Sequence, residues 1–101
     1  MNMQGMLAQA QKMQKELQKK LDEFYKKEFE IDYKNGSVIV NIYGSGQIKS
    51  LKINPALIDP EDPITLQEMV AEAVNEATDA MKQQADEIQS SAMPAGFGGL
   101  F

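Results

Sequence analysis

Residues 3 to 26 predict one long helix that carries two opposed stripes of side chains. Apolar residues recur there at helical spacing, and at about 100° per residue they fall within roughly one third of the circumference. Four lysines gather on the opposite side. Such a helix buries its apolar stripe against a partner and leaves its cations facing outward. The apolar stripe is Met3, Met6, Leu7, Ala10, Met13, Leu17, Leu21 and Phe24, and the lysine stripe is Lys12, Lys15, Lys19 and Lys26.

Charge is unevenly distributed along the chain, which has 101 residues and a net charge of −5. Residues 1–53 hold nine lysines and six acids, whereas residues 54–101 hold one lysine and nine acids. The front of the chain is therefore mildly basic and the rear strongly acidic. Because every cation is a lysine, contacts to a polyanion would rest on point charges that distinguish sequences poorly.

The residue types that are missing exclude most catalytic and metal-binding chemistry. The sequence has no histidine, cysteine, arginine or tryptophan, so it lacks the usual general base, the thiolate nucleophile and the common nitrogen and sulfur metal ligands. The acids Asp59, Glu61 and Asp62 lack the spacing and central glycine of a calcium loop. Residues 44–46 (Gly-Ser-Gly) indicate a turn between strands rather than a phosphate loop, because no helix follows them. We expect no enzyme activity, metal, cofactor or small-molecule substrate.

Nothing in the sequence points to a membrane or to secretion. No apolar run approaches the roughly 18 residues that a spanning helix needs. The first residues lack a charged region followed by an apolar core, and without cysteine there is no disulfide framework. We therefore expect a soluble cytoplasmic protein with no membrane partner.

Three segments with a period of two predict an antiparallel meander at residues 28–33, 37–43 and 47–53. Asn35-Gly36 is a strong hairpin signal between the first two strands, since both residue types tolerate positive φ. Ile48 is out of phase with the inward positions of the third strand, which indicates a bulge near the second turn. The inward-facing residues are expected to be Phe29, Ile31, Tyr33, Val38, Val40, Ile42, Leu51 and Ile53.

A second long helix is predicted to run to about Ser90, after one helical turn at residues 55–58. Thr65 and Glu68 have the spacing of a capping box, with Ile64 and Met69 placed as a hydrophobic staple. The overall prediction is an α+β fold: a long N-terminal helix, a three-stranded antiparallel meander and a long C-terminal helix. Residues 1–93 would form this single domain, and residues 94–101 a flexible tail that contains glycine and apolar side chains.

The length of the first helix predicts a second copy of the chain. A helix over residues 3–26 is about 36 Å long, whereas strands of seven residues are only about 23 Å long. Part of the helix should then extend beyond its own domain and leave apolar side chains in water. A homodimer with heptad-like contacts would cover them. The residues expected to pack in the dimer are Met3, Met6, Leu7, Ala10 and Met13.

Five ordered blocks of sequence resemble the YbaB/EbfC family of nucleoid-associated proteins. They are residues 3–14, residues 36–40 with the turn at 44–46, residues 53–58 with Asp62, residues 73–77, and the tail with Met93-Pro94. The resemblance implies a three-stranded sheet with two long helices, in intertwined homodimers whose helices project. It also implies DNA binding with weak or variable sequence preference, and association with the bacterial nucleoid.

Two main functional hypotheses follow. In the first, a homodimer binds double-stranded DNA through the lysine stripe, with Lys20 and Lys27 at its edges, by phosphate contacts with little sequence selectivity. In the second, the lysines are a solvated face with local partners such as Glu16, and the acidic half of the chain and its tail bind another protein. A membrane-surface helix is a weaker alternative, since the apolar stripe has no tryptophan.

Overall fold

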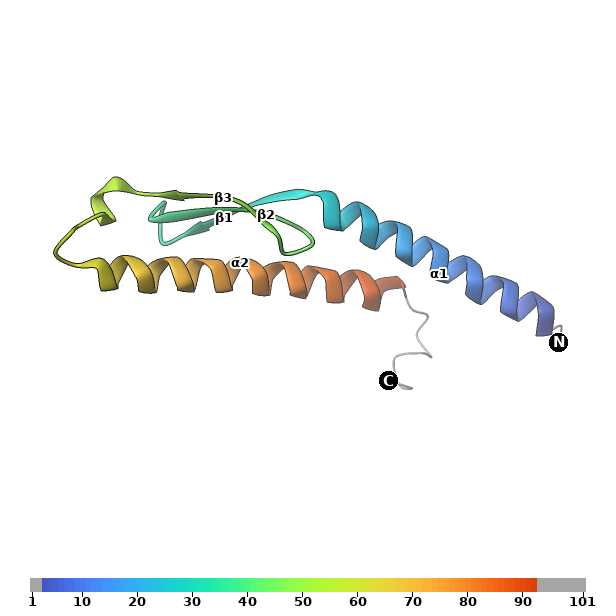
Figure 1. Cartoon of the computed structure of the whole chain (residues 1–101). Coiled ribbons are helices and arrows are strands. Elements are labelled where there is room, and N and C mark those ends of the chain that lie inside the picture. The colour runs from blue at the N-terminus through green and yellow to red at the C-terminus, as the bar shows by residue number, and fades with distance from the viewer. Residues whose placement is uncertain (1–2, 93–101) are drawn as a thin grey trace.

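The computed structural model describes residues 3–92 and contains the predicted order of elements. The strands pair antiparallel in the order β1-β2-β3, which confirms the predicted α+β fold with its meander (Figure 1). The tail predicted for residues 94–101 lies outside the described residues. The elements are α1 (Met3–Lys26), β1 (Glu28–Tyr33), β2 (Val38–Tyr43), β3 (Ile48–Ile53), the short 3-10 helix η1 (Pro55–Leu57) and α2 (Pro63–Ala92).

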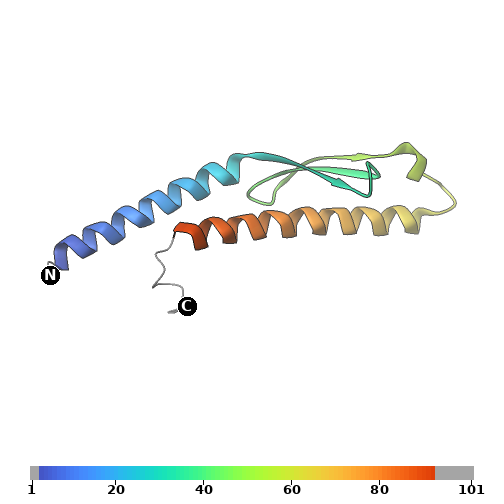
Figure 2. The same ribbon diagram turned by 180° about the vertical axis from the view of Figure 1, so that it is seen from behind.

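The molecule is elongated because its two helices are arranged differently around the sheet. It measures 71 × 25 × 17 Å along its principal axes. In both views α2 runs along one face of the sheet, whereas α1 leaves the end of the sheet and continues past the body (Figures 1 and 2). No helix between residues 3 and 92 is both long and apolar enough to cross a bilayer.

The core lies between the sheet and α2. Alternate residues of the central strand β2, Val38, Val40 and Ile42, are fully buried, as period two predicts. They pack in one cluster with Ala73 and Ala77 of α2, whose small side chains let the helix come close to the sheet. Ala73 and Ala77 thus lie on the inward side of α2, and this layer holds the sheet in place for α1 to extend from it.

The predicted bulge in β3 is confirmed. Asn41 pairs with Ser50 and Ile42 with Ile48, so Lys49 is an extra residue on β3. The extra residue brings Ile48 back to the side of the sheet that faces α2, where it packs against the core.

The turn between β2 and β3 holds the last turn of α1. The backbone N–H of Gly44 donates to the carbonyl of Lys27 at 2.9 Å, and that of Ser45 donates to the carbonyl of Tyr25 at 3.2 Å. Carbonyls at a helix C-terminus have no partner within the helix, so the turn supplies the missing donors. A Cβ atom on Gly44 would lie 2.0 Å from the carbonyl oxygen of Phe24. This contact, which we call the turn clasp, therefore requires glycine at position 44.

The start of α2 differs from the prediction. The helix begins at Pro63, and the carboxylate of Asp62 accepts hydrogen bonds from the Thr65 hydroxyl at 2.6 Å and the Thr65 N–H at 3.3 Å. Asp62 is therefore the capping residue, and the capping box assigned to Thr65 and Glu68 was wrong. Ile64 is exposed, so the predicted staple with Met69 was wrong too. Aspartate followed by proline is itself a strong helix start, and it comes before the alternative.

We expect Gly44→Ala to destabilise the fold by about 2–3 kcal/mol, because the added methyl group meets rigid backbone and the turn clasp must open. Urea unfolding measured by circular dichroism gives the free energy. Ser45→Ala is the matched control, since Ser45 contributes its backbone N–H to the clasp, and its effect should stay within about 0.5 kcal/mol. Equal effects of the two substitutions would contradict the role given to Gly44.

The Asp62 cap should make stability depend on acid pH. Hydrogen bonds from the hydroxyl and then the backbone of Thr65 lower the pKa of the Asp62 carboxyl below its usual value of 3.8. A depressed pKa in the folded state contributes stability above the unfolded pKa, and that stability is lost as the pH falls through the folded value. We expect the thermal midpoint of the wild type to exceed that of Asp62→Ala at neutral pH, with the gap narrowing below the usual pKa. The side chain of Asp62→Asn cannot titrate. The difference in thermal midpoint between Asp62→Asn and Asp62→Ala should therefore stay the same as the pH falls.

Candidate nucleic-acid interface

The apolar stripe of α1 passes from buried to exposed along the helix. Leu21 and Phe24 are buried at the end that meets the sheet and α2. Met3, Met6 and Leu7 at the other end are 83%, 57% and 61% exposed. The prediction that part of the helix extends beyond its own domain is confirmed. One half of α1 is thus an anchor, and the other half is an arm with nothing from the described residues covering its apolar side.

All four lysines of the predicted stripe, Lys12, Lys15, Lys19 and Lys26, are exposed. The two ion pairs formed by the described residues are elsewhere and do not involve α1. The local pairing of Lys12 with Glu16 that would neutralise part of the stripe is not among them. Within residues 3–92 the stripe is therefore a row of cations with no ion-pair partner.

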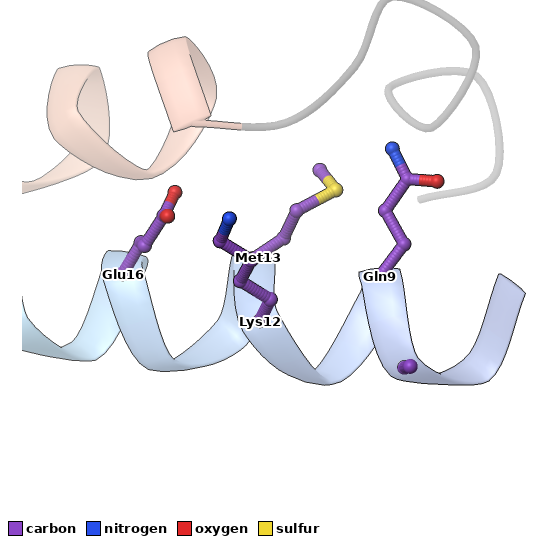
Figure 3. Close-up of a pocket in the computed structure, with 5 residues that line it drawn as sticks. Gln9, Lys12, Met13 and Glu16 are labelled. Carbon is purple, nitrogen blue, oxygen red and sulfur yellow. The ribbon is translucent and has the colours of Figure 1, made fainter. Parts of the chain in front are cut away.

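One edge of the lysine stripe adjoins the apolar stripe. Figure 3 shows Gln9, Met13 and Glu16 extending from the same side of α1, with Lys12 beside them. These side chains and Ala8 line a shallow hollow on the helix surface. Glu16 is an acid at this edge, so the positive surface of the arm ends here and faces away from Met13.

Two further lysines, Lys20 and Lys27, lie in a different place. They line a shallow groove between the anchor half of α1 and the last turns of α2, together with Gln84 and Ile88. Glu23 lines the same groove and offsets part of their charge. The structure thus separates these two lysines from the row of four on the outward side.

The outward face of α2 has the opposite charge. Between residues 63 and 92 the sequence holds six acids and one lysine, Lys82. At helical spacing, most of these acids project from the side of α2 opposite the buried Ala73 and Ala77. A polyanion would therefore be repelled from this face and attracted to α1. The acids are Glu68, Glu72, Glu76, Asp79, Asp86 and Glu87.

One of those acids joins the β1–β2 hairpin to α2. The hydroxyl of Tyr33 donates a hydrogen bond to Glu72, and the Lys34 ammonium lies 4.0 Å from the same carboxylate. Lys34 also sits 5.3 Å from the centroid of the Tyr33 ring. The hydrogen bond to the Glu72 carboxylate raises the pKa of Tyr33. Lys34 is thus paired with Glu72 and does not add to the positive surface on α1.

The acidic loop before α2 uses its carboxylates within the chain. Asp59 accepts from the backbone N–H of Glu61 at 3.0 Å, and Asp62 caps α2. Residues 3–92 contain no group of three or more side chains arranged to hold a metal ion.

Together these features define a small α+β protein that presents a row of four lysines without ion-pair partners on one projecting helix. The chain belongs to the YbaB/EbfC DNA-binding family, whose sequence profile matches residues 1–97. The predicted resemblance is therefore confirmed.

Relatives cover nearly the whole chain. A nucleoid-associated protein of Malacoplasma penetrans is 45% identical over 93% of this chain and 99% of its own length. A nucleoid-associated protein of Ureaplasma urealyticum is 40% identical, with 97% and 98% covered. An uncharacterised protein of Mycoplasma pneumoniae is 49% identical, with 95% and 92% covered. These matches support a nucleoid DNA-binding role.

Sequence reasoning missed the residues that position the arm. Gly44 and Ser45 were recognised as a turn, but their contact with α1 was not predicted, nor was the link from Tyr33 to Glu72. The sequence held one signal for the contact of the turn with α1. Residues 44–46 contain two glycines, which is more than a tight turn needs. The link from Tyr33 to Glu72 joins residues 39 positions apart and leaves no local pattern.

Proposed function

We propose that the protein binds duplex DNA as a homodimer, mainly through phosphate contacts made by Lys12, Lys15, Lys19 and Lys26. Binding has little sequence selectivity. The protein acts at the nucleoid in the cytoplasm, where it affects nucleoid organisation and gene expression. The observation that carries this proposal is the row of exposed lysines without ion-pair partners along α1. The family match and the nucleoid-associated names of the relatives support the same role.

The dimensions of the row suit a phosphate backbone. Lys12 and Lys26 are 14 positions apart, or about 21 Å along the helix. That length corresponds to roughly six base pairs at about 3.4 Å each. Lysine ammonium groups neutralise phosphates as point charges and position a duplex without identifying its bases. The acidic face of α2 directs the duplex to the arm by repulsion.

The homodimer is proposed because the arm has an uncovered apolar side. Met3, Met6 and Leu7 together expose more apolar surface than isolated side chains on a monomer usually do. Ala10 and Met13 continue the same stripe toward the body. A second copy that covers this stripe leaves the lysines outward, because they lie on the opposite side of the helix.

Replacing Lys12, Lys15 and Lys19 by Gln should weaken binding equally on all sequences. Eight lysines per dimer would neutralise about 4–6 phosphates and give a slope of log affinity against log salt of roughly −4 to −5. Removing six of those charges should reduce the slope to roughly −1 and weaken binding at least about tenfold near 100 mM salt. Fluorescence anisotropy on labelled duplexes of unrelated sequence, from about 25 to about 200 mM salt, measures both quantities.

The matched control is Lys49→Gln/Lys52→Gln/Lys82→Gln, which has the same net charge but leaves α1 intact. It should keep most of the affinity and nearly the full slope. An equal loss of affinity in the control would mean that net charge alone explains the weaker binding. Loss of affinity for one DNA sequence alone would contradict binding through phosphate contacts.

A second candidate function rests on the acidic face of α2. With six acids and one lysine, this helix could serve a protein-interaction module that does not bind DNA, and the tail at residues 94–101 would contribute apolar contacts. The lysines of α1 would then only be solvated.

Deletion of residues 94–101 discriminates between the two functions. DNA binding through α1 predicts little change in anisotropy, because the lysine stripe is intact. The interaction module predicts loss of a co-purifying protein partner on truncation, and no binding of the full chain to DNA even at about 25 mM salt, where phosphate contacts are strongest.

A further inference from the structure

The turn between β1 and β2, residues 34–37, contains an asparagine with an unusual neighbour. The sequence has five asparagines, and Asn35 is the one that precedes a glycine. Glycine has no side chain, so nothing on residue 36 hinders the approach of its backbone nitrogen to the side chain of Asn35. The other four asparagines are followed by larger residues, which are Met3, Ile42, Pro55 and Glu76.

The hairpin turn is open to solvent. Asn35 is exposed, and a Cβ atom added to Gly36 would meet none of the more distant described residues within 4 Å. Lys34, Asn35 and Gly36 have φ angles of 48°, 53° and 82°, so three successive residues lie in the left-handed region. Asparagine and glycine are the residue types that adopt this conformation most readily. Water therefore reaches the Asn35–Gly36 peptide bond from outside the fold.

An exposed asparagine before glycine can react with its own backbone. The Gly36 nitrogen loses its proton and attacks the side-chain carbonyl carbon of Asn35, and the side-chain nitrogen leaves as ammonia. The product is a five-membered succinimide ring. Water then opens the ring at either carbonyl and gives aspartate or isoaspartate, in which the backbone runs through the former side-chain carbon. One water is consumed, one ammonia is released, and nothing is oxidised or reduced.

Asp32 holds the nitrogen that has to attack. The backbone N–H of Gly36 donates to Oδ1 of Asp32 at 2.6 Å. This hydrogen bond favours the protonated nitrogen, and the charge of the carboxylate opposes formation of a nitrogen anion beside it. The N–H and the hydroxyl of Ser37 both donate to the carbonyl of Lys34, at 3.2 and 2.7 Å, and close the turn around Gly36. The fold thus restrains a reaction that the local sequence favours.

We propose that Asn35 is a site of spontaneous modification, at which its amide becomes a carboxylate, and that Asp32 sets the rate through its hydrogen bond to Gly36. The chain is its own substrate, and water is the co-reactant. The inference is independent of the proposed DNA binding. β1 begins beside the end of α1 and runs away from it, so the hairpin turn lies at the end of the sheet far from the lysine stripe (Figure 1).

Modification should loosen the hairpin. Isoaspartate adds one atom to the backbone of a turn whose length is matched to the pairing of Tyr33 with Val38. Both products also place a negative charge next to Lys34, which then competes with Glu72, 4.0 Å away, for this ammonium group. Aged protein should therefore unfold at a lower temperature than fresh protein.

Storage of the folded protein in warm, mildly alkaline buffer tests the proposal, with peptide mass spectrometry to locate and quantify the modified residue. Asp32→Ala removes the acceptor of the Gly36 N–H and should raise the rate at Asn35 severalfold above that of the wild type. Glu30→Ala is the matched control, because Glu30 is an exposed acid on the same side of β1 and its loss changes the net charge equally. Its rate should stay near that of the wild type. Asn54 is an internal standard that should stay intact, since the following proline has no N–H.

Circular dichroism establishes that each variant is folded, so that faster reaction does not come from unfolding. Asp32→Asn is a second variant that keeps the size of the side chain and offers a weaker, neutral acceptor, and its rate should lie between those of the wild type and Asp32→Ala. Equal rates in the wild type and both Asp32 variants would overturn the inference, as would an equal acceleration by Glu30→Ala. If Asn35 stays intact in every folded variant while the chain unfolded in urea is modified, Asn35 is not a modification site of the folded protein.

Discussion

The turn clasp determines where α1 extends, and the candidate interface depends on it. Two backbone N–H groups, those of Gly44 and Ser45, satisfy carbonyls at the last turn of α1 and just beyond it. Phe24 continues this attachment into the core. Without the clasp, only the packing of Leu21 and Phe24 would fix the direction of α1 and of its lysine stripe. The candidate interface needs only a row of charges that is held in a fixed direction, because such a row is enough to position a polyanion.

The net charge of −5 conceals a strong separation of charge. Acids concentrate on the outward face of α2, while the cations on α1 stand apart from them. Two lysines outside α1 form ion pairs, Lys34 with Glu72 and Lys49 with Glu28. A chain that is acidic overall can therefore keep one positive surface. Screening at physiological salt, with a Debye length of about 8 Å, makes the nearby row more important than the distant acids.

The sequence was sufficient to predict what depends on local periodicity. The buried alternation of Val38, Val40 and Ile42 and the bulge at Lys49 followed from a period of two and from one residue out of phase. Local patterns also produced the main error. Thr65 and Glu68 have the spacing of a capping box, but the helix begins earlier and Asp62 caps it by accepting hydrogen bonds from Thr65. The turn clasp and the Tyr33–Glu72 link could not be predicted, because they join residues far apart in sequence. The lysine and dimer residues stay predictions, supported by their exposure.

The rigid attachment of α1 restricts how its length can change. A residue inserted between Leu17 and Leu21 would rotate everything before it by about 100°, so the arm's cations and apolar side chains would each turn by more than a quarter of the circumference relative to the body. Insertion of seven residues would turn it by only about 20° and lengthen it by about 10 Å. Arms of this kind can therefore be lengthened or shortened during evolution in steps close to whole helical turns, whereas a step of one or two residues turns the charges away from their original side.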